Sequence, residues 1–225
     1  MSFILSLLFA CGEEKTDSAE PLPKPVLVDI TLLDAIQGDA MGNATLTSTL
    51  DEQTTDATGK ATVLVQEEQA ITVIATASGY IPHHLELFSG RTNYSAVSLM
   101  ASREAGIQIY SLLNPSLEVQ VDKGIVIVAL DNPDLSPAVG ARASISGNSD
   151  DPFILTNISA TYSNEVTASA AGFVAFPNVE AGAHTITVTS PEGKTCQQHV
   201  AGAVETAEIE VLADTVHVVF FMCAE

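Results

Sequence analysis

Two kinds of side chain in this sequence could bind a metal ion. His83, His84 and Glu86 offer imidazole nitrogens and a carboxylate, which are ligand types that zinc accepts. Neighbouring residues of a strand point to opposite faces, so we do not expect both imidazoles at one metal. The acidic segments 131–134 and 148–151 offer oxygen ligands for calcium, but neither has the spacing, glycine and terminal glutamate of a calcium loop. Asx turns explain them more simply, so we predict no metal site and no cofactor.

Patterns typical of catalysis are absent from the sequence. It contains no Gly-X-Ser-X-Gly elbow, no His-Glu-X-X-His pattern and no pair of carboxylates whose setting suggests separate acid and base roles. The remaining histidines, His184, His199 and His217, lie in or beside predicted strands, where a histidine is ordinarily structural. We therefore predict that the protein is not an enzyme and has no catalytic residues.

The cysteines are the other chemically distinctive residues. Cys11 follows a short apolar run, and the segment Leu8-Phe9-Ala10-Cys11 resembles the lipobox of bacterial lipoproteins. This resemblance implies a lipoprotein signal at residues 1–11 and a lipid on Cys11, which becomes the new N-terminus. The apolar run has about half of the roughly 20 residues needed to span a bilayer. Because no Lys or Arg precedes it, an unlipidated chain with an apolar N-terminus is the alternative.

If lipid occupies Cys11, Cys196 and Cys223 remain as an even pair. Export places the protein in an oxidising compartment, so we expect these two to form a disulfide. Closing a loop of about 28 residues contributes about 3–4 kcal/mol in the chain-entropy treatment. Two unrelated buried thiols would be the alternative in a cytosolic protein. Residues 12–25 are acidic and proline-rich, which predicts a disordered tether between the lipid and the folded body.

Composition limits the possible partners. The 225 residues are 46% hydrophobic with a mean hydropathy of +0.27, which predicts a folded protein of one large or two small domains. The net charge of −20 disfavours binding to nucleic acids or anionic headgroups. The absence of Trp weakens the case for a carbohydrate site, because such sites usually stack the sugar on an aromatic face.

The elements that must position these residues are strands. Short β-branched stretches bounded by Gly, Pro, Asn or Asp recur about every ten residues, and several alternate apolar side chains with threonine. No segment has a convincing helical period. The pattern predicts an all-β sandwich fold. The predicted strands are 26–32, 61–65, 70–76, 124–130, 184–189, 207–212 and 215–221.

The body of the chain also repeats itself. Residues 56–80 and 169–193 share a turn glycine, a following strand and a second turn, with spacings that match within one residue. Their upstream segments correspond as well. We therefore predict two related domains, residues 26–115 and 122–225. The glycines expected to need positive φ at chain reversals are Gly59, Gly172 and Gly182.

Residues 171–188 resemble the carboxypeptidase-regulatory-like, transthyretin-like domains, which show a turn glycine, an aromatic-flanked strand, a second glycine turn and another strand. The first copy departs from that pattern, because residues 66–69 replace the second glycine turn. The resemblance implies two tandem Ig- or transthyretin-like antiparallel β-sandwiches. Such modules commonly serve as accessory, adhesive or spacer domains of secreted and envelope proteins.

These features predict a bacterial cell-envelope lipoprotein, at the outer membrane, that acts as a non-catalytic binding, adhesive or spacer module. Its partners would be the membrane, through the lipid anchor, and protein or polysaccharide at the cell surface. The alternatives are a secreted carbohydrate- or calcium-dependent binding protein and an accessory subunit of a surface enzyme. Residues 89–113 are expected to complete the first sandwich, or to offer a strand edge to a partner.

Overall fold

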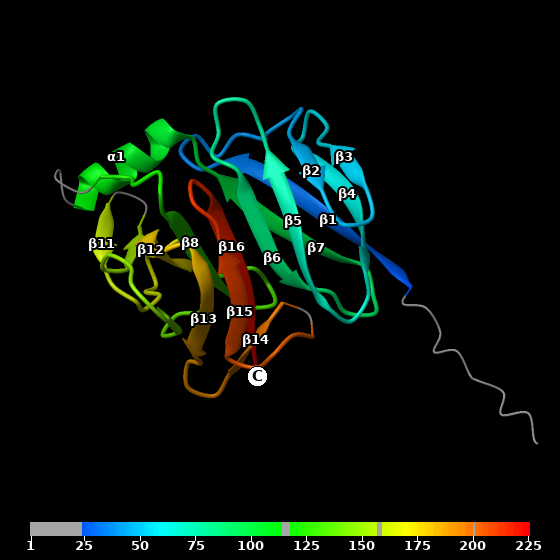
Figure 1. Ribbon diagram of the computed structural model, residues 1–225. Helices are drawn as coiled ribbons and strands as arrows, with labels where there is room; N and C mark the ends of the chain where they lie inside the picture. The colour runs from blue at the N-terminus through cyan, green and yellow to red at the C-terminus, as the bar shows by residue number, and fades with distance from the viewer. Residues whose placement is uncertain (1–23, 114–117, 157–158, 200) are drawn as a thin grey trace, which may run out of the picture.

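The computed structural model describes residues 24–113, 118–156, 159–199 and 201–225. Strands dominate these ranges, so the predicted all-β sandwich fold is confirmed (Figure 1). The predicted lipobox, with Cys11, and most of the tether lie outside the described residues. The strands are β1 (Pro25–Asp34), β2 (Thr45–Thr47), β3 (Glu52–Thr54), β4 (Lys60–Gln66), β5 (Ala70–Thr76), β6 (His83–Phe88), β7 (Tyr94–Met100), β8 (Gly124–Asp131), β9 (Arg142–Ile145), β10 (Phe153–Leu155), β11 (Ala160–Tyr162), β12 (Phe173–Val179), β13 (Gly182–Thr189), β14 (Thr195–Gln198), β15 (Thr206–Val211) and β16 (Val216–Ala224).

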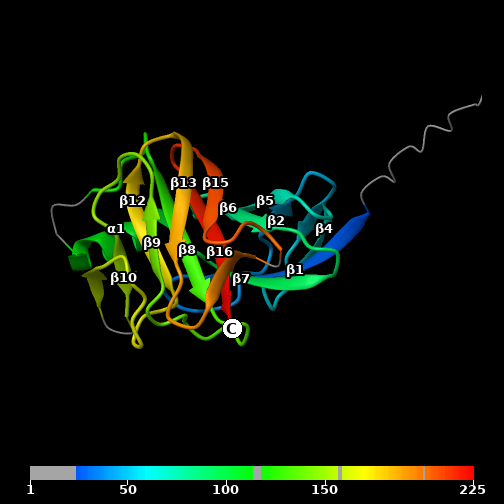
Figure 2. The same ribbon diagram turned by 90° about the horizontal axis from the view of Figure 1, so that it is seen from below.

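Two sandwiches lie side by side. In the first, the sheet β4-β1-β7 packs against β6, β5, β2 and β3 of a large sheet. In the second, the sheet β9-β13-β15 packs against β12, β8 and β16 at the other end of that large sheet (Figure 2). The cores form because apolar side chains at alternate positions face inward, as on β1, whose inward residues are Val26, Val28, Ile30 and Leu32.

The sequence repeat is also a repeat of strand pairing. β1 pairs antiparallel with β4 and parallel with β7, just as β8 pairs antiparallel with β12 and parallel with β16. The Leu32 amide donates to the Gly59 carbonyl at 2.8 Å, and the Leu130 amide donates to the Gly172 carbonyl at 2.7 Å. Gly59 and Gly172 have φ of 74° and 77°, and Gly182 also has positive φ, as predicted. The two-domain boundaries themselves stay a prediction.

The last strand, β16, belongs to both sandwiches. It runs parallel to β8 on one side and parallel to β6 on the other, which joins the sheets of the two halves into one of ten strands. Its alternate residues Val216, Val218 and Phe220 complete the first core. Val219 and Phe221, together with the next alternate residue Cys223, complete the second core. The two sandwiches are therefore joined by a shared strand as well as by the covalent chain.

The structure differs from the sequence predictions at two points. No helix was expected, yet α1 (Arg103–Leu113) follows β7. Ser102 caps the N-terminus of α1, because its Oγ accepts a hydrogen bond from the backbone amide of Ala105 at 3.1 Å. Glu104 lies in the first turn, where its negative charge stabilises the positive end of the helix dipole. The sandwiches were also expected to be antiparallel, and most of their strand pairs are, but β7 runs parallel to β1 and β16 runs parallel to β8 and β6.

β7 adds the last strand of the first sandwich, as expected for part of the segment 89–113. It pairs with β1 on one side and, within the described ranges, with no strand on the other. Among the described residues, no helix has the length and apolar character needed to cross a membrane.

Candidate functional site

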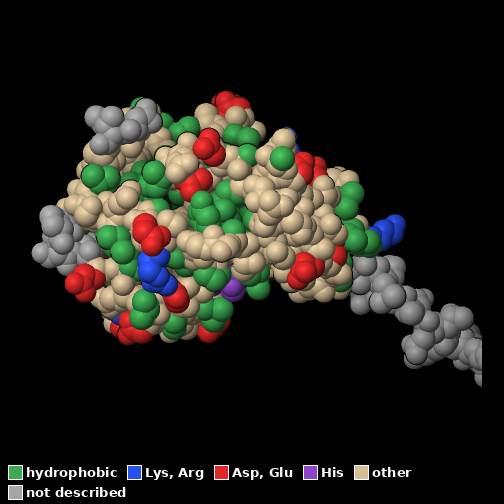
Figure 3. Space-filling view, turned by 90° about the horizontal axis from the view of Figure 1, so that it is seen from above, with side chains coloured by type: hydrophobic (Ala, Val, Ile, Leu, Met, Phe, Trp, Pro, Cys, Tyr) green, Lys and Arg blue, Asp and Glu red, His purple; other side chains and the backbone are tan. Residues whose placement is uncertain are grey.

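A cavity of about 370 Å³ lies where the two sandwiches meet beneath α1. Its floor is formed by β8, β12 and β16, and its walls include β7 and α1. Figure 3 shows hydrophobic side chains gathered near the junction of the two halves. Most residues lining the cavity are apolar, among them Val97, Leu99, Ile109, Ile125, Ile127, Ala129, Phe153, Leu155, Phe173 and Ala175.

β8 supplies the central row of the floor. Ile125, Ile127, Ala129 and Asp131 occupy alternate positions and face the cavity, whereas the residues between them enter the second core. Both faces of this strand are therefore covered by apolar surroundings. This explains why its sequence is apolar at nearly every position, a pattern typical of strands buried on both sides.

Three polar side chains of the lining are almost completely buried. Tyr110 is 2% exposed, Ser98 is 3% exposed and His199 is 6% exposed. Within the described part of the chain, Tyr110 Oη, Ser98 Oγ and His199 Nδ1 have no hydrogen-bond partner. Burial raises the pKa of Tyr110 and lowers that of His199 to about 4, so both groups are neutral at pH 7.

Asp131 is the fourth polar group of the cavity and ends the apolar row on β8. Burial raises the pKa of its carboxyl to about 7, and burial is the only cause of the shift. No cation or donor among the described residues therefore stabilises the carboxylate. The corresponding residue of the first sandwich is Leu33, because Leu32 and Leu130 make the same hydrogen bond to their turn glycines. The sandwich fold itself thus has no need for a carboxyl at this position.

The two adjacent histidines at the start of β6 point to opposite faces, as the alternation argument required. His83 is fully buried, its Nδ1 lies 2.8 Å from the Ile81 carbonyl oxygen, and burial lowers its pKa to about 4. His84 points to the other face with Glu86, where His217 of β16 joins them. Reasoning from the sequence missed this third member, because 131 residues separate His217 from Glu86.

His84, Glu86 and His217 form a group whose ligand atoms lie within 4.8 Å of one another. The Leu212 amide donates to His217 Nε2 at 3.0 Å, so that nitrogen carries no proton. The proton is then on Nδ1, which donates to Glu86 Oε1 at 3.1 Å. A metal on Nδ1 would shift the proton to Nε2, facing the amide hydrogen. The arrangement suits a hydrogen-bonded pair between β6 and β16 and does not suit a metal site.

The acidic segments lie in two different settings. In the first, Asp131 lines the cavity while Asp134 accepts hydrogen bonds from the Ser136 amide and hydroxyl at 3.0 and 2.6 Å, as in the expected Asx turn. In the second, Asp150 Oδ2 accepts a hydrogen bond from the side-chain Nδ2 of Asn178 at 2.7 Å. The structure therefore does not bring the carboxylates of the first segment together at one point.

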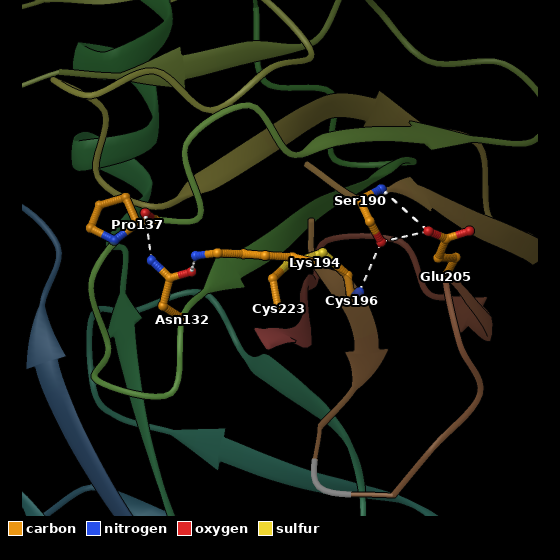
Figure 4. Close-up of a disulfide and its surroundings, with 7 residues drawn as sticks. All are labelled: Asn132, Pro137, Ser190, Lys194, Cys196, Glu205 and Cys223. Atoms are coloured by element: carbon orange, nitrogen blue, oxygen red, sulfur yellow. Dashed lines mark hydrogen bonds between the residues drawn. A yellow bond between two sulfur atoms is a disulfide. The ribbon is translucent and has the colours of Figure 1, made fainter. Parts of the chain in front are cut away.

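The predicted disulfide between Cys196 and Cys223 is confirmed (Figure 4). The two residues face each other across β14 and β16, which fixes a hairpin to the shared strand. Beside it, Lys194 donates to Asn132 Oδ1 at 2.5 Å. Lys194 thus holds the residue after Asp131, and Asp131 itself keeps no cationic partner.

Comparison with known proteins leaves the function open. No protein-family model matches the chain, and no curated protein matches its sequence. Among solved structures, the TIE protein of Bacillus anthracis is 12% identical to this chain, with a TM-score of 0.28. The match covers 89% of this chain and 34% of the TIE protein chain. The minor pilin of Streptococcus agalactiae is 10% identical with a TM-score of 0.30, over 89% of this chain and 96% of its own. The major pilin of Streptococcus pyogenes is 11% identical, with a TM-score of 0.30, and the match covers 89% of this chain and 98% of the pilin chain.

Proposed function

We propose that this protein is a non-catalytic binding module of a bacterial cell envelope, and that the cavity between its sandwiches is the binding site. The cavity of about 370 Å³ carries this proposal. Sites for small molecules typically measure about 300–1,000 Å³, are mostly apolar and contain a few polar groups that orient the ligand. The apolar floor together with Tyr110, Ser98, His199 and Asp131 has that composition.

A binding role accounts for features that a simple spacer would not need. A buried polar group without a partner costs about 1–3 kcal/mol. Tyr110, Ser98 and His199 each leave one such atom in or beside the cavity. A ligand with hydrogen-bonding groups would recover part of that cost, whereas a spacer would be more stable with the cavity filled by larger apolar side chains.

The cavity can be tested with a neutral fluorescent apolar probe, N-phenyl-1-naphthylamine, and its displacement by decanol. Ala129→Phe places a large side chain on the half-buried floor of β8, so we expect loss of displaceable probe binding. Ala213→Phe adds the same side chain at an exposed turn and should behave as the parent protein. Equal displaceable binding by parent and Ala129→Phe would contradict the proposed site.

The envelope location rests on the resemblance of residues 8–11 to a lipobox. Intact mass of the natively expressed protein from the membrane fraction tests it. We expect a chain that begins at Cys11 and carries a diacylglyceryl group, and we expect Cys11→Ala to leave the membrane fraction. An unprocessed chain of unmodified mass would remove the envelope assignment and would not affect the cavity.

A further inference from the structure

We propose that the cavity binds an elongated apolar molecule with one cationic head group, and that the Asp131 carboxylate is its counter-ion. This inference rests on the proposed function, because it names the class of ligand for the same cavity. It follows from the order of residues along β8, the charges of the lining and the difference between the two copies of the repeat.

The order of residues along β8 fits such a molecule. Ile125, Ile127 and Ala129 form an apolar row on the cavity face, and Asp131 follows at its end. An alkyl chain lying along this row would bury its methylene groups and bring its head group to the carboxylate. Removing each methylene from water contributes about 0.8 kcal/mol, so the row supplies affinity while Asp131 selects the head group.

The charges of the lining favour a cation over an anion or a neutral molecule. The described lining residues include no Lys and no Arg. An anionic head group would therefore meet Asp131 without a counter-ion. A neutral ligand would cover the carboxylate and leave it desolvated, which is costly for an unpaired charge. An ammonium group would supply the missing partner and a charge-assisted hydrogen bond.

The neighbours of Asp131 leave its carboxylate free for a ligand. Gly172, at φ of 77°, lies so close that an added Cβ would be 2.6 Å from Asp131 Oδ1. Any larger residue would displace the carboxyl group. Lys194 donates to the neighbouring residue, Asn132, and makes no ion pair with Asp131. Besides Asp131, the titratable groups of the described lining are His199 and Tyr110, and Asp134 lies in the adjoining turn.

The two copies of the repeat differ most informatively along this row. On β1, the positions equivalent to Ile127, Ala129 and Asp131 are Asp29, Thr31 and Leu33. The first copy thus has polar residues followed by an apolar one, as expected for an outward-facing strand. The second copy reverses the order, with apolar residues followed by a carboxyl, at the floor of the cavity.

The test compares three probes with the same ten-carbon chain, decylamine, decanol and decanoate, by displacement of a fluorescent apolar probe. At pH 8 we expect decylamine to bind roughly 10- to 100-fold more tightly than decanol, as for a charge-assisted hydrogen bond. Decanoate should bind more weakly than decanol. At pH 5.5 the Asp131 carboxyl, whose pKa is raised by burial to about 7, is mostly protonated in the ligand-free protein, so the preference for the amine should fall sharply.

Two variants separate a local counter-ion from the overall charge of −20. Asp131→Asn should lose the preference for decylamine at both pH values and bind it no more tightly than decanol. Asp134→Asn removes the same charge from the adjoining exposed turn and should keep the preference of the parent protein. Equal loss of preference in both variants, or equal binding of amine and alcohol by the parent, would overturn the counter-ion role. If none of the three probes bound, both the counter-ion role and the proposed binding function would be wrong.

Discussion

Replacement of Phe221 by alanine tests whether the two sandwiches unfold as one unit. Phe221 is 2% exposed and lies in the core of the second sandwich. A Phe→Ala change in a core costs about 3–5 kcal/mol. Unfolding of the second sandwich also removes β16 from the first, and with it the buried side chains of Val216, Val218 and Phe220. Burial of such side chains contributes about 1.5–3 kcal/mol each, so the first sandwich would lose roughly 5–9 kcal/mol. That loss is comparable to the whole stability of a typical domain.

Hydrogen exchange read by mass spectrometry distinguishes the two halves. We expect Phe221→Ala to lower the protection of β1 and β4 in the first sandwich as much as that of β8 and β13 in the second. The variant should unfold in a single urea transition. Its midpoint should lie at a lower urea concentration than that of the parent, by an amount that matches the loss of unfolding free energy. Leu27→Ala, on the exposed face of β1, should leave protection in both halves unchanged. Unchanged protection of β1 and β4 in Phe221→Ala, with loss confined to β8 and β13, would refute the shared-strand reasoning.

Three further predictions concern stability. Replacing both Cys196 and Cys223 by alanine should lower the free energy of unfolding by about 3–4 kcal/mol under oxidising conditions, and equal melting temperatures would argue against a stabilising disulfide. Gly59→Ala should cost roughly 2–4 kcal/mol in urea unfolding, because Gly59 has φ of 74° and an added Cβ would overlap the Leu32 carbonyl oxygen; a cost below 1 kcal/mol would contradict this. Asp131→Asn should stabilise the protein by roughly 1–3 kcal/mol at pH 8, with the gain shrinking towards pH 4. The sign follows because the raised pKa of about 7 means that the folded state loses stability as pH rises through that value; a gain independent of pH would exclude this cause.

Local patterns in the sequence predicted the strands and the turn glycines well. Alternation of apolar and polar side chains acts over a few residues, so β5 could be recognised without knowledge of its neighbours. Pairing of Cys196 with Cys223 followed from counting, and the structure places both on adjacent strands. α1 was missed because its apolar residues are irregularly spaced and it buries only Ala105, Gly106 and Tyr110. Its cap at Ser102 was the available signal.

The cavity could not be predicted, because its walls come from segments far apart in the chain. Alternation correctly placed His83 and His84 on opposite faces, but it could not bring His217 to Glu86 across 131 residues. One sequence signal did point to unusual burial. β8 and β16 are apolar at nearly every position, which indicates strands covered on both faces. A strand of an isolated sandwich has one face towards solvent. The sequences of β8 and β16 therefore already indicated that their outer faces are covered by another part of the protein.

The repeat explains how such a cavity arises from one fold used twice. β7 and β16 are equivalent last strands, yet β7 alternates buried and exposed residues while β16 is buried on both faces. An apolar β16 can pair with β6 on one side and β8 on the other, which continues the large sheet from the first sandwich to the floor of the cavity. The changes on β8, from Thr31 to Ala129 and from Leu33 to Asp131, lie on that same floor. If these changes served packing alone, the row on β8 would be apolar at every position. The carboxyl of Asp131 at the end of the row is instead what a binding site would require.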